Sequence, residues 1–136
     1  SRWRQDVQDT MDMEIDTLTE AVIGCAYRVH TELGAGFLES VYKNALLYEL
    51  RKVGLSAQAE VPLDVIYDET VIGHFLADII VNGVLILELK AVARLERSHE
   101  QQLVHYLKAT GIDNGLLINF GTQRAEIKRK FRTLKT

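Results

Sequence analysis

The sequence predicts an α/β domain in which a mixed central sheet is flanked by helices, with the elements in the order ααβββαββ. Three observations support this fold class. Apolar residues recur at helical spacing up to Val53, and they alternate at strand spacing after Gly54. A nearly continuous apolar run at residues 115–120 is typical of a strand that is covered on both faces. Helices mixed with strands in this way predict a sheet with helices packed against it.

The chain has 136 residues, of which 47% are hydrophobic and 26% are charged. This length is sufficient for one domain with its own core, and the composition excludes a disordered, collagen-like or disulfide-rich chain. Cys25 is the only cysteine, so no internal disulfide can form, and we expect a reducing compartment, the cytoplasm. The longest uncharged apolar stretch, residues 79–87, is far shorter than the roughly 20 residues of a membrane-spanning helix, so we expect no membrane span.

Charge is unevenly distributed along the chain, which carries a net charge of −3. Residues 1–20 hold two basic and six acidic side chains, whereas residues 121–136 hold six basic side chains and one acidic side chain. The first 16 residues are polar without a clear period, so we expect a loose lead-in or a short helix before a single domain at residues 17–136. The negative total argues against a protein that holds nucleic acid by bulk charge alone.

Two helices are expected at the start of this domain. The capping-box spacing Thr17-Leu-Thr-Glu20 predicts that the first helix begins at Thr17, and a glycine turn at residues 34–36 ends it. Apolar residues at helical spacing predict a second helix from about Leu38 to Val53. Both helices have one apolar face, so both are expected to pack on the sheet.

Five strands and a third helix follow. The predicted strands are residues 61–67, 71–81, 84–90, 115–120 and 127–132. Asn82-Gly83, between the second and third of them, is the strongest short signal for a hairpin turn. A second capping box, Ser98-His-Glu-Gln101, predicts the start of the third helix, which a glycine at position 111 ends. In the last strand Ile127, Arg129 and Phe131 alternate with Lys128, Lys130 and Arg132, which suggests a sheet edge.

Three charged residues, Asp78, Glu88 and Lys90, interrupt the apolar strands. Acidic residues are poor strand formers, and buried charges are normally paired or bound to metal. Carboxylate oxygens suit Mg²⁺ or Mn²⁺, and a lysine ammonium is a point-charge partner for phosphate, so these residues could form a hard-cation site. A salt bridge at the end of a strand is the alternative, and the spacing alone leaves both open.

Side chains on two predicted helices could join this cluster. Glu39 borders the apolar face of the second helix and follows a glycine turn. Gln102 and Tyr106 are spaced by four residues on the third helix, which places them on one face. Taken singly, Gln102 is typical of a surface amide and Tyr106 of a half-buried aromatic residue with a solvated hydroxyl.

Residues 36–42, Gly-Phe-Leu-Glu-Ser-Val-Tyr, resemble the motif that names the GxxExxY proteins, a branch similar to the PD-(D/E)XK nuclease superfamily. Neighbouring segments extend the resemblance over roughly residues 17–133. They are Val29-His30 with Leu33-Gly34, Ala77-Asp78-Ile79, residues 87–92, Gln102 with Tyr106-Leu107, and residues 117–121. The segments are specific as an ordered set, although each one alone is a weak signal.

The resemblance implies a restriction-endonuclease-like core and a set of site residues. By this resemblance, Asp78 and Glu88 hold a divalent metal, Mg²⁺ or Mn²⁺. Lys90 serves the attacking water, and Glu39 assists as a further acid.

Other positions match or depart from the pattern. Gln102 and Tyr106 resemble the helix motif that follows the lysine in RecB-like nucleases. Ala77 stands where the superfamily has proline, which keeps the aspartate and loses only rigidity. A glutamine is expected in the first strand, where the nearest candidates are Gln58 and Glu60.

The resemblance therefore implies metal-dependent hydrolysis of phosphodiester bonds in DNA or RNA. We expect Lys128, Lys130 and Arg132 on the last strand to bind the nucleic acid, although lysines on an edge strand also serve to block edge pairing. Two alternatives stay open. One is a catalytically silent nucleic-acid-binding or protein-interaction module on the same fold, and the other is a partner subunit whose acidic N-terminus docks elsewhere. A homodimer is open as well.

The hairpin at Asn82-Gly83 provides a geometric test of the metal site. With a regular two-residue loop, Asp78 and Glu88 point to opposite faces of the sheet, because directly paired residues share a face. The site therefore requires a loop of three or five residues, or a bulge near Asp78. If residues 81–83 form a three-residue loop, Asp78 pairs with Ile86 and shares a face with Glu88.

Overall fold

The structure is a computed structural model that describes residues 1–133, the side chains of Met11 and Met13 excepted. Its elements are α1 (Arg2–Leu33), α2 (Glu39–Lys52), β1 (Ala57–Tyr67), β2 (Thr70–Val81), β3 (Leu85–Lys90), α3 (Arg97–Thr110), β4 (Asn114–Asn119) and β5 (Glu126–Phe131). This order confirms the predicted ααβββαββ.

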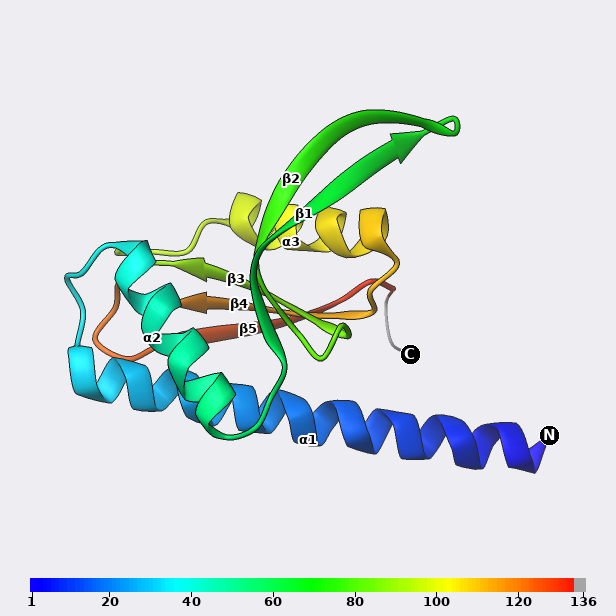
Figure 1. Ribbon diagram of the computed structural model, residues 1–136, viewed down its shortest axis with the longest axis horizontal. Coiled ribbons are helices and arrows are strands. Elements are labelled where there is room, and N and C mark those ends of the chain that lie inside the picture. The colour runs from blue at the N-terminus through cyan, green and yellow to red at the C-terminus, as the bar shows by residue number, and fades with distance from the viewer. Residues whose placement is uncertain (134–136) are drawn as a thin grey trace.

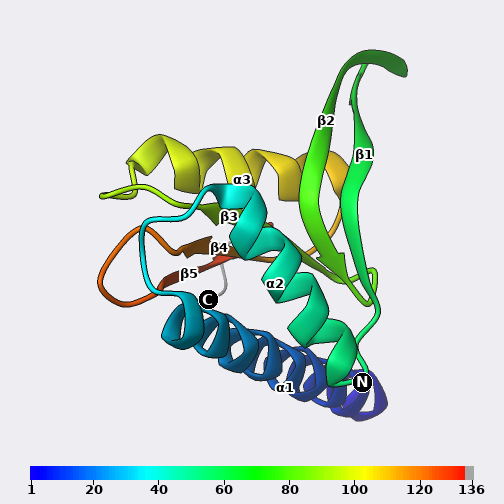
Figure 2. The ribbon, with the colours of Figure 1, turned by 60° about the vertical axis from the view of Figure 1, so that its left-hand side comes forward.

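The strands form one mixed sheet in the order β1-β2-β3-β4-β5 (Figure 1). Among these strands, only β3 and β4 are parallel, and α3 is the crossover that joins them. Helices α1 and α2 cover one face of the sheet, and α3 covers the other (Figures 1 and 2). The fold is therefore the mixed α/β arrangement that the sequence predicts.

Each face of the sheet has its own core. Below α1 and α2 the buried residues include Val22, Tyr42, Leu46, Leu85, Leu116 and Phe120. Below α3 they are Ala77, Ile80, Ile86, Leu103, Leu107 and Leu117. Strand β4 is buried along its whole length, which explains the nearly continuous apolar run in its sequence.

The predicted start of the first helix is wrong, because α1 begins at Arg2 and not at Thr17. Residues 2–16 contain neither glycine nor proline, so nothing in them interrupts a helix. A side-chain hydrogen bond of 2.8 Å from Gln5 to Asp9 adds i,i+4 support. The helix therefore runs through the predicted lead-in, and a domain boundary at residue 17 stays a prediction.

The predicted capping box of the third helix is also displaced. Helix α3 begins at Arg97, and its capping box is formed by Glu96 and His99 instead of Ser98 and Gln101. The Glu96 N–H donates to Nδ1 of His99 at 3.0 Å, so a histidine takes the position that a glutamate or glutamine usually holds.

No helix in the described part of the chain is both long and apolar enough to cross a bilayer.

Strands β1 and β2 form a long hairpin that extends beyond the rest of the sheet (Figure 1). β2 pairs with β3 only at residues 79–81, whereas it pairs with β1 along most of its length. Asp68 and Glu69 form the tight turn at the tip, and both have positive φ. Strand β1, which contains Pro62, forms one edge of the sheet. Strand β5 forms the other edge, as the sequence predicts.

The hairpin between β2 and β3 has a three-residue loop, Asn82-Gly83-Val84, because Val81 pairs with Leu85. The odd loop length that the metal site requires is confirmed, but the predicted loop at residues 81–83 is wrong by one residue. Asn82 and Gly83 both adopt positive φ, and the Val84 N–H donates to the Val81 carbonyl at 3.0 Å. These two residues are therefore the centre of the turn, and Val84 is its third residue.

The shifted loop changes which residues face each other across the hairpin. Ile80 pairs with Ile86, so the same register, carried two residues further, places Asp78 directly opposite Glu88. The predicted pairing of Asp78 with Ile86 is wrong. Asp78 and Glu88 are thus closer than the diagonal arrangement would have made them.

Candidate functional site

The predicted acidic residues meet at a fork in the sheet, where β2 leaves β3. The backbone pairing ends at Ile79 and Leu87, and Asp78 and Glu88 are the next residues on the two strands. Ile79 packs below α1 and α2, whereas Ala77 packs below α3. Because residues two apart share a face in a regular strand, β2 turns over at Asp78.

Side chains replace the backbone pairing at the fork. Oδ2 of Asp78 accepts a hydrogen bond from the Leu89 N–H at 2.8 Å, and Oε1 of Glu88 accepts one from the Asp78 N–H at 3.4 Å. Burial raises the pKa of Glu88 to about 8, and the negative charge of Asp78 contributes to the rise. The fork therefore holds two acidic groups together in a setting that disfavours their joint ionisation.

Lys90 completes the group that the sequence singles out. It lies two residues after Glu88 on β3 and so belongs to the same face of the strand. Its positive charge lowers the pKa of Glu88 and partly opposes the effects of burial and of Asp78. The fold thus brings Asp78, Glu88 and Lys90 together from two strands.

A buried asparagine fixes the chain just after Lys90. Asn119 lies beside Lys90 on β4, and its side chain bonds both the N–H and the carbonyl of Val92, at 3.0 and 2.9 Å. Gly121 approaches Val92 so closely that a Cβ at this position would lie 2.3 Å from the Val92 carbonyl oxygen. These contacts explain part of the motif at residues 117–121, and they set the direction in which the chain leaves β3.

Helix α3 brings Tyr106 into the field of the acid pair. Its ring stacks on Phe75 of β2, with the ring centroids 3.7 Å apart. Burial raises the pKa of the Tyr106 hydroxyl, and the negative charges of Glu88 and Asp78 raise it further. Gln102 lies one turn earlier on α3 and is exposed, and its side chain makes no hydrogen bond within the described residues.

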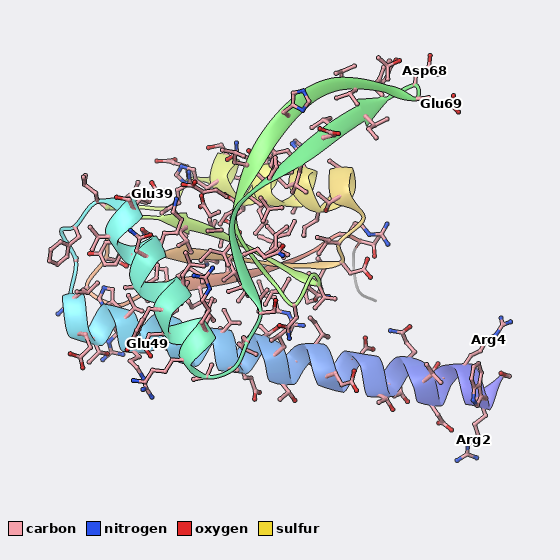
Figure 3. All side chains as sticks on the ribbon, viewed as in Figure 1. Arg2, Arg4, Glu39, Glu49, Asp68 and Glu69 are labelled. Carbon is pink, nitrogen blue, oxygen red and sulfur yellow. The ribbon has the colours of Figure 1, made fainter. Side chains whose placement is uncertain are left out.

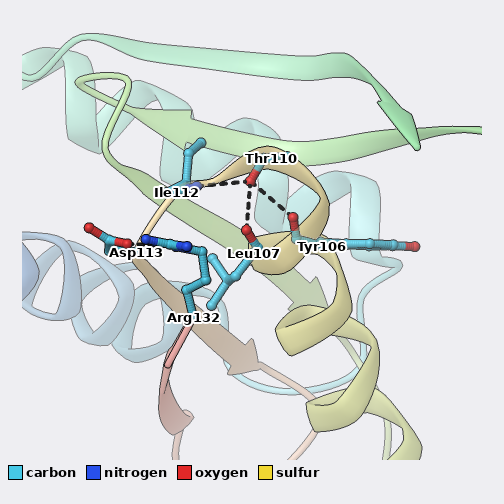
Figure 4. A network of polar contacts seen from close by, with 6 residues as sticks. All are labelled: Tyr106, Leu107, Thr110, Ile112, Asp113 and Arg132. Carbon is cyan, nitrogen blue, oxygen red and sulfur yellow. Dashed lines mark hydrogen bonds and ion pairs between the residues drawn. The ribbon is translucent and has the colours of Figure 1, made fainter. Parts of the chain in front are cut away.

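Polar contacts hold the carboxyl end of α3 (Figure 4). The Thr110 hydroxyl bonds the carbonyls of Tyr106 and Leu107 at 2.9 and 3.3 Å. Nε of Arg132 donates to the Asp113 carboxylate at 2.7 Å and ties the residue after β5 to the loop after α3. The turn of helix that carries Tyr106 is therefore anchored at the backbone.

The glycine turn before α2 positions Glu39. Gly36 has a φ of 115°, which disfavours any residue with a side chain. The buried Tyr42 donates from its hydroxyl to the Gly34 carbonyl and accepts from the Phe37 N–H at 3.2 Å, so it ties down the turn. Glu39 is the first residue of α2 and lies at the end of the helix nearest the carboxyl end of β3 (Figures 1 and 3).

Lys43 is a neighbour of the site that the sequence analysis missed. It lies one turn after Glu39, and its ammonium binds Oε1 of Glu60 at 2.7 Å. The hydrogen bond to Glu60 raises the pKa of Lys43, and the charges of Asp78 and Glu39 raise it further. Glu60 lies opposite Asp78 on β1 and has a φ of 51°, an unusual value inside a strand. The sequence signal that could have identified Lys43 is its spacing of four residues from Glu39, which places both side chains on one face of α2.

The predicted nucleic-acid contacts on β5 lie two strands away from the fork. Lys128 is paired with Leu117 of β4, which is paired with Glu88 of β3, so all three belong to the α3 side of the sheet. Lys130 lies two residues further along the same face of β5. The basic strand and the acid pair therefore share a face without touching.

Of the three predicted nucleic-acid contacts, Lys130 and Arg132 have acidic partners within the chain. Nζ of Lys130 binds Glu100 of α3 at 2.6 Å. Arg132 binds Asp113 at 2.7 Å, as described above (Figure 4). Their positive charges are therefore partly neutralised by the fold.

The two carboxylates at the fork fit a hard divalent cation. In the part of the chain that the structure describes, no group of three or more His, Cys, Asp and Glu residues is suited to hold a metal. Asp78 and Glu88 bring two carboxylates to the fork from adjacent strands. Mg²⁺ is commonly bound by one or two carboxylates, with waters and substrate phosphates as the other ligands. The donor set thus fits Mg²⁺ or Mn²⁺ shared with a phosphate, and not a closed structural site.

A mixed five-stranded sheet flanked by helices, with an acid pair and a lysine on adjacent strands, is consistent with a restriction-endonuclease-like fold. A family model of the PD-(D/E)XK nuclease superfamily matches residues 16–130. Because the match covers most of the chain, the protein belongs to this superfamily. No curated protein and no solved structure matches the chain.

Proposed function

We propose that the protein hydrolyses phosphodiester bonds in DNA or RNA, with Mg²⁺ or Mn²⁺ held by Asp78 and Glu88. The observation that carries the proposal is the position of Asp78 opposite Glu88, with Lys90 on the same face of β3. Membership of a nuclease superfamily supports a nucleic-acid substrate. The proposal extends that membership to catalytic activity.

Both carboxylates would hold the metal in this proposal. A divalent metal at the site would supply Lewis-acid neutralisation of the phosphate charge and would lower the pKa of a water molecule. Glu88 must lose its proton to act as a ligand, and a cation beside it favours that loss. Asp78 is held by the Leu89 N–H, which fixes its carboxylate on the β3 side of the fork.

The lysines and α3 supply the other contacts. Lys90 would orient or deprotonate the attacking water, or stabilise the charge that develops on the phosphate. Lys43, held by Glu60, is a second cation beside the acids and would contact a phosphate oxygen. Glu39 would act as a further acid, and Gln102 and Tyr106 would contact the substrate from α3, as the resemblance implies.

The nucleic acid beyond the fork would bind the basic strand. Lys128, Lys130 and Arg132 lie on or just after β5, and Lys128 makes no ion pair within the described residues. The cytoplasm, as a reducing compartment, fits a chain whose one cysteine is buried and free.

Assignment to the GxxExxY branch is also part of this proposal. Each named residue of that motif has a clear place here. Gly36 permits the turn, Glu39 opens α2, and Tyr42 ties the turn to the helix. The motif therefore serves to present one acid at the edge of the site.

A cleavage assay tests the proposal. The chain is incubated with single- and double-stranded DNA and RNA in the presence of Mg²⁺ or Mn²⁺, and again with a chelator. We expect cleavage of at least one substrate that requires the metal and is lost in Asp78→Asn and Glu88→Gln. Asp64→Asn is the matched control, because Asp64 is an exposed acid that faces His74 on the hairpin.

Calorimetry of Mn²⁺ binding accompanies the assay. Metal binding that is lost in both site variants, with cleavage in the wild type, supports the proposal. Wild-type cleavage in both variants would show that the site lies elsewhere. Metal binding without cleavage of any substrate would contradict catalysis and favour a silent binding module.

A further inference from the structure

The β1–β2 hairpin continues beyond the rest of the sheet as a two-stranded arm, made of residues 61–67 and 70–77 (Figure 1). One edge of β2 pairs with β1 along the arm. The other edge pairs with β3 only at residues 79–81, and beyond the fork it pairs with no strand that the structure describes. Its backbone N–H and C=O groups are therefore available to an added strand.

The two edges of the arm differ in their protection against strand pairing. On β1, Pro62 lacks an N–H, Asp64 carries a charge, and Glu60 has a φ of 51°. On β2, Ile72 is the extra residue of a bulge, but residues 73–77 pair regularly with β1 and contain no proline, aspartate, glutamate, lysine or arginine. Prolines, charges and irregular backbone are the usual protection of an edge strand, so residues 73–77 form an unprotected edge.

Apolar side chains are exposed on the face of the arm that points away from α3. Phe75 stacks on Tyr106 of α3, so the neighbouring Leu76 points to the opposite face. Leu76 is 59% exposed, and Ile66 and Val71, which pair with each other nearer the tip, are 62% and 47% exposed. Grouped apolar residues on a projecting ribbon are typical of a surface that binds another protein.

The charge of the arm indicates the chemistry of that protein. Between Lys52 and Lys90 the sequence contains no lysine and no arginine. Asp68 and Glu69 lie at the tip of the arm (Figure 3), and neither has an ion pair within the described residues. The arm therefore repels the phosphates of a nucleic acid and the same arm of a second copy, and it is complementary to a cationic partner.

We infer that the arm binds an extended segment of a different protein, which adds as a strand to β2 at residues 73–77. Apolar side chains of this segment contact Leu76, and its basic side chains lie where the added strand reaches Asp68 and Glu69. Backbone hydrogen bonds give such a complex its affinity, and side chains give it specificity. The inference is independent of the proposed nuclease activity.

Titration with a synthetic peptide tests the inference. The probe is a fluorescent peptide in which threonine and valine alternate and which ends in a pair of lysines, and the matched peptide ends in a pair of glutamates. We expect the lysine peptide to bind, and the glutamate peptide to bind more weakly by about tenfold or more. Binding of the lysine peptide should also weaken as salt is added, because salt screens exposed charges.

Amide hydrogen exchange identifies the edge that the peptide occupies. We expect the lysine peptide to slow exchange within residues 73–77 of β2 and to leave β5, the edge strand on the far side of the sheet, unchanged. A version of the peptide with an N-methylated backbone cannot donate hydrogen bonds, so it should lose both binding and protection.

Two sets of variants separate the apolar contacts from the charged ones. Leu76→Thr should weaken peptide binding by about tenfold, and Val53→Thr, at an exposed position after α2, is the matched control. Asp68→Asn with Glu69→Asn should remove most of the salt dependence and keep the turn, because asparagine tolerates positive φ. Glu32→Gln, at an exposed acid of α1, is the control for charge. Amide exchange without peptide confirms that the arm stays folded in each variant.

A lysine peptide that does not bind, or that binds without slowing exchange in β2, would overturn the inference. Stronger protection of residues 73–77 by a single-stranded oligonucleotide would make nucleic acid the occupant. A dimer that forms without peptide and is lost in Leu76→Thr would make a second copy the occupant. Either of these last two results excludes the partner proposed here.

Discussion

The acid pair at the fork and the basic strand β5 are both charged regions of the same sheet face, but the fold treats their charges differently. At the fork, two carboxyl groups are brought together and partly buried, and the pKa of Glu88 rises to about 8 as a result. On β5 and just after it, Lys130 and Arg132 each lie within 2.7 Å of an acid from the same chain. At the fork the fold places like charges side by side, which is unfavourable. At β5 it pairs positive charges with acids, which is favourable.

This difference distinguishes a candidate ligand-binding site from ion pairs that only support the fold. Like charges in a half-buried position weaken the fold unless something outside the chain neutralises them, so their presence points to a ligand. Opposite charges at a sheet edge contribute modestly to stability and discourage edge pairing, which needs no ligand. We therefore expect the largest functional effects at the fork and the smallest on β5.

Loss of the lysine at the fork should give the largest effect. Lys90→Met keeps the aliphatic stem and removes the ammonium, so we expect the cleavage rate to fall by about 10²–10⁴-fold while Mn²⁺ binding persists. Single-turnover cleavage and calorimetry measure the two quantities. Lys108→Met, an exposed lysine on α3, is the control. Unchanged cleavage in Lys90→Met would remove this residue from the proposed mechanism.

The acid pair should make the stability of the metal-free protein depend on pH. The pKa of Glu88 is raised in the folded state, so its contribution is full below its unfolded value, near 4.5, and is lost as the pH rises through about 8. Glu88→Gln should therefore flatten the stability profile and exceed the wild type in melting temperature above pH 8. Thermal melts across this window measure it.

Metal provides the control for this experiment. Mg²⁺ or Mn²⁺ should raise the melting temperature of the wild type at alkaline pH and leave Glu88→Gln little changed, because a ligand stabilises the state that binds it. A wild-type stability that rises from pH 5 to 8 without metal would contradict the account of the acid pair.

Lys43 and Glu60 should have opposite effects on substrate affinity. Lys43→Met removes a proposed phosphate contact and should lower the slope of log affinity against log salt by about 0.7–0.9. Glu60→Gln releases Lys43 from its ion pair and should tighten binding. Binding to a fluorescent oligonucleotide in Ca²⁺ measures both. Equal effects of the same sign would show that the pair serves only to hold α2 against β1.

The basic strand should give the smallest effect. Replacing Lys128, Lys130 and Arg132 by Gln should reduce the salt slope by about one contact at most, roughly 0.9, since two of these cations already have acidic partners. Titrations at several salt concentrations give the slope. No change would leave β5 as edge protection alone, and a loss of about three contacts would make it the main binding surface.

Much of this fold follows from local patterns in the sequence. The order of elements comes from the change of apolar period after Gly54 and from turn residues between strands, and these signals do not depend on distant contacts. The requirement for an odd hairpin loop also follows from sequence, because the faces of a strand alternate strictly. Asp78, Glu88 and Lys90 stand out for the same reason, as charges within apolar strands.

The remaining features depend on alternatives that local sequence patterns do not distinguish, or on tertiary contacts. The capping box at Thr17 is a valid helix start, but the preceding residues are helical too, so α1 continues to Arg2. The loop position shifted by one residue because Asn82 and Gly83 together form the centre of the turn. Lys43 meets Glu60 only when α2 packs beside β1, a tertiary contact that no short motif encodes.

The three-residue loop between β2 and β3 also constrains how this hairpin can change in evolution. Inserting or deleting one residue between Asp78 and Glu88 would rotate one acid to the other face of the sheet, unless a bulge compensated. A change of two residues would keep both on one face. Side chains at Asn82–Val84 can therefore vary within their backbone requirements, whereas the length of the segment is as much a part of the site as the acids themselves.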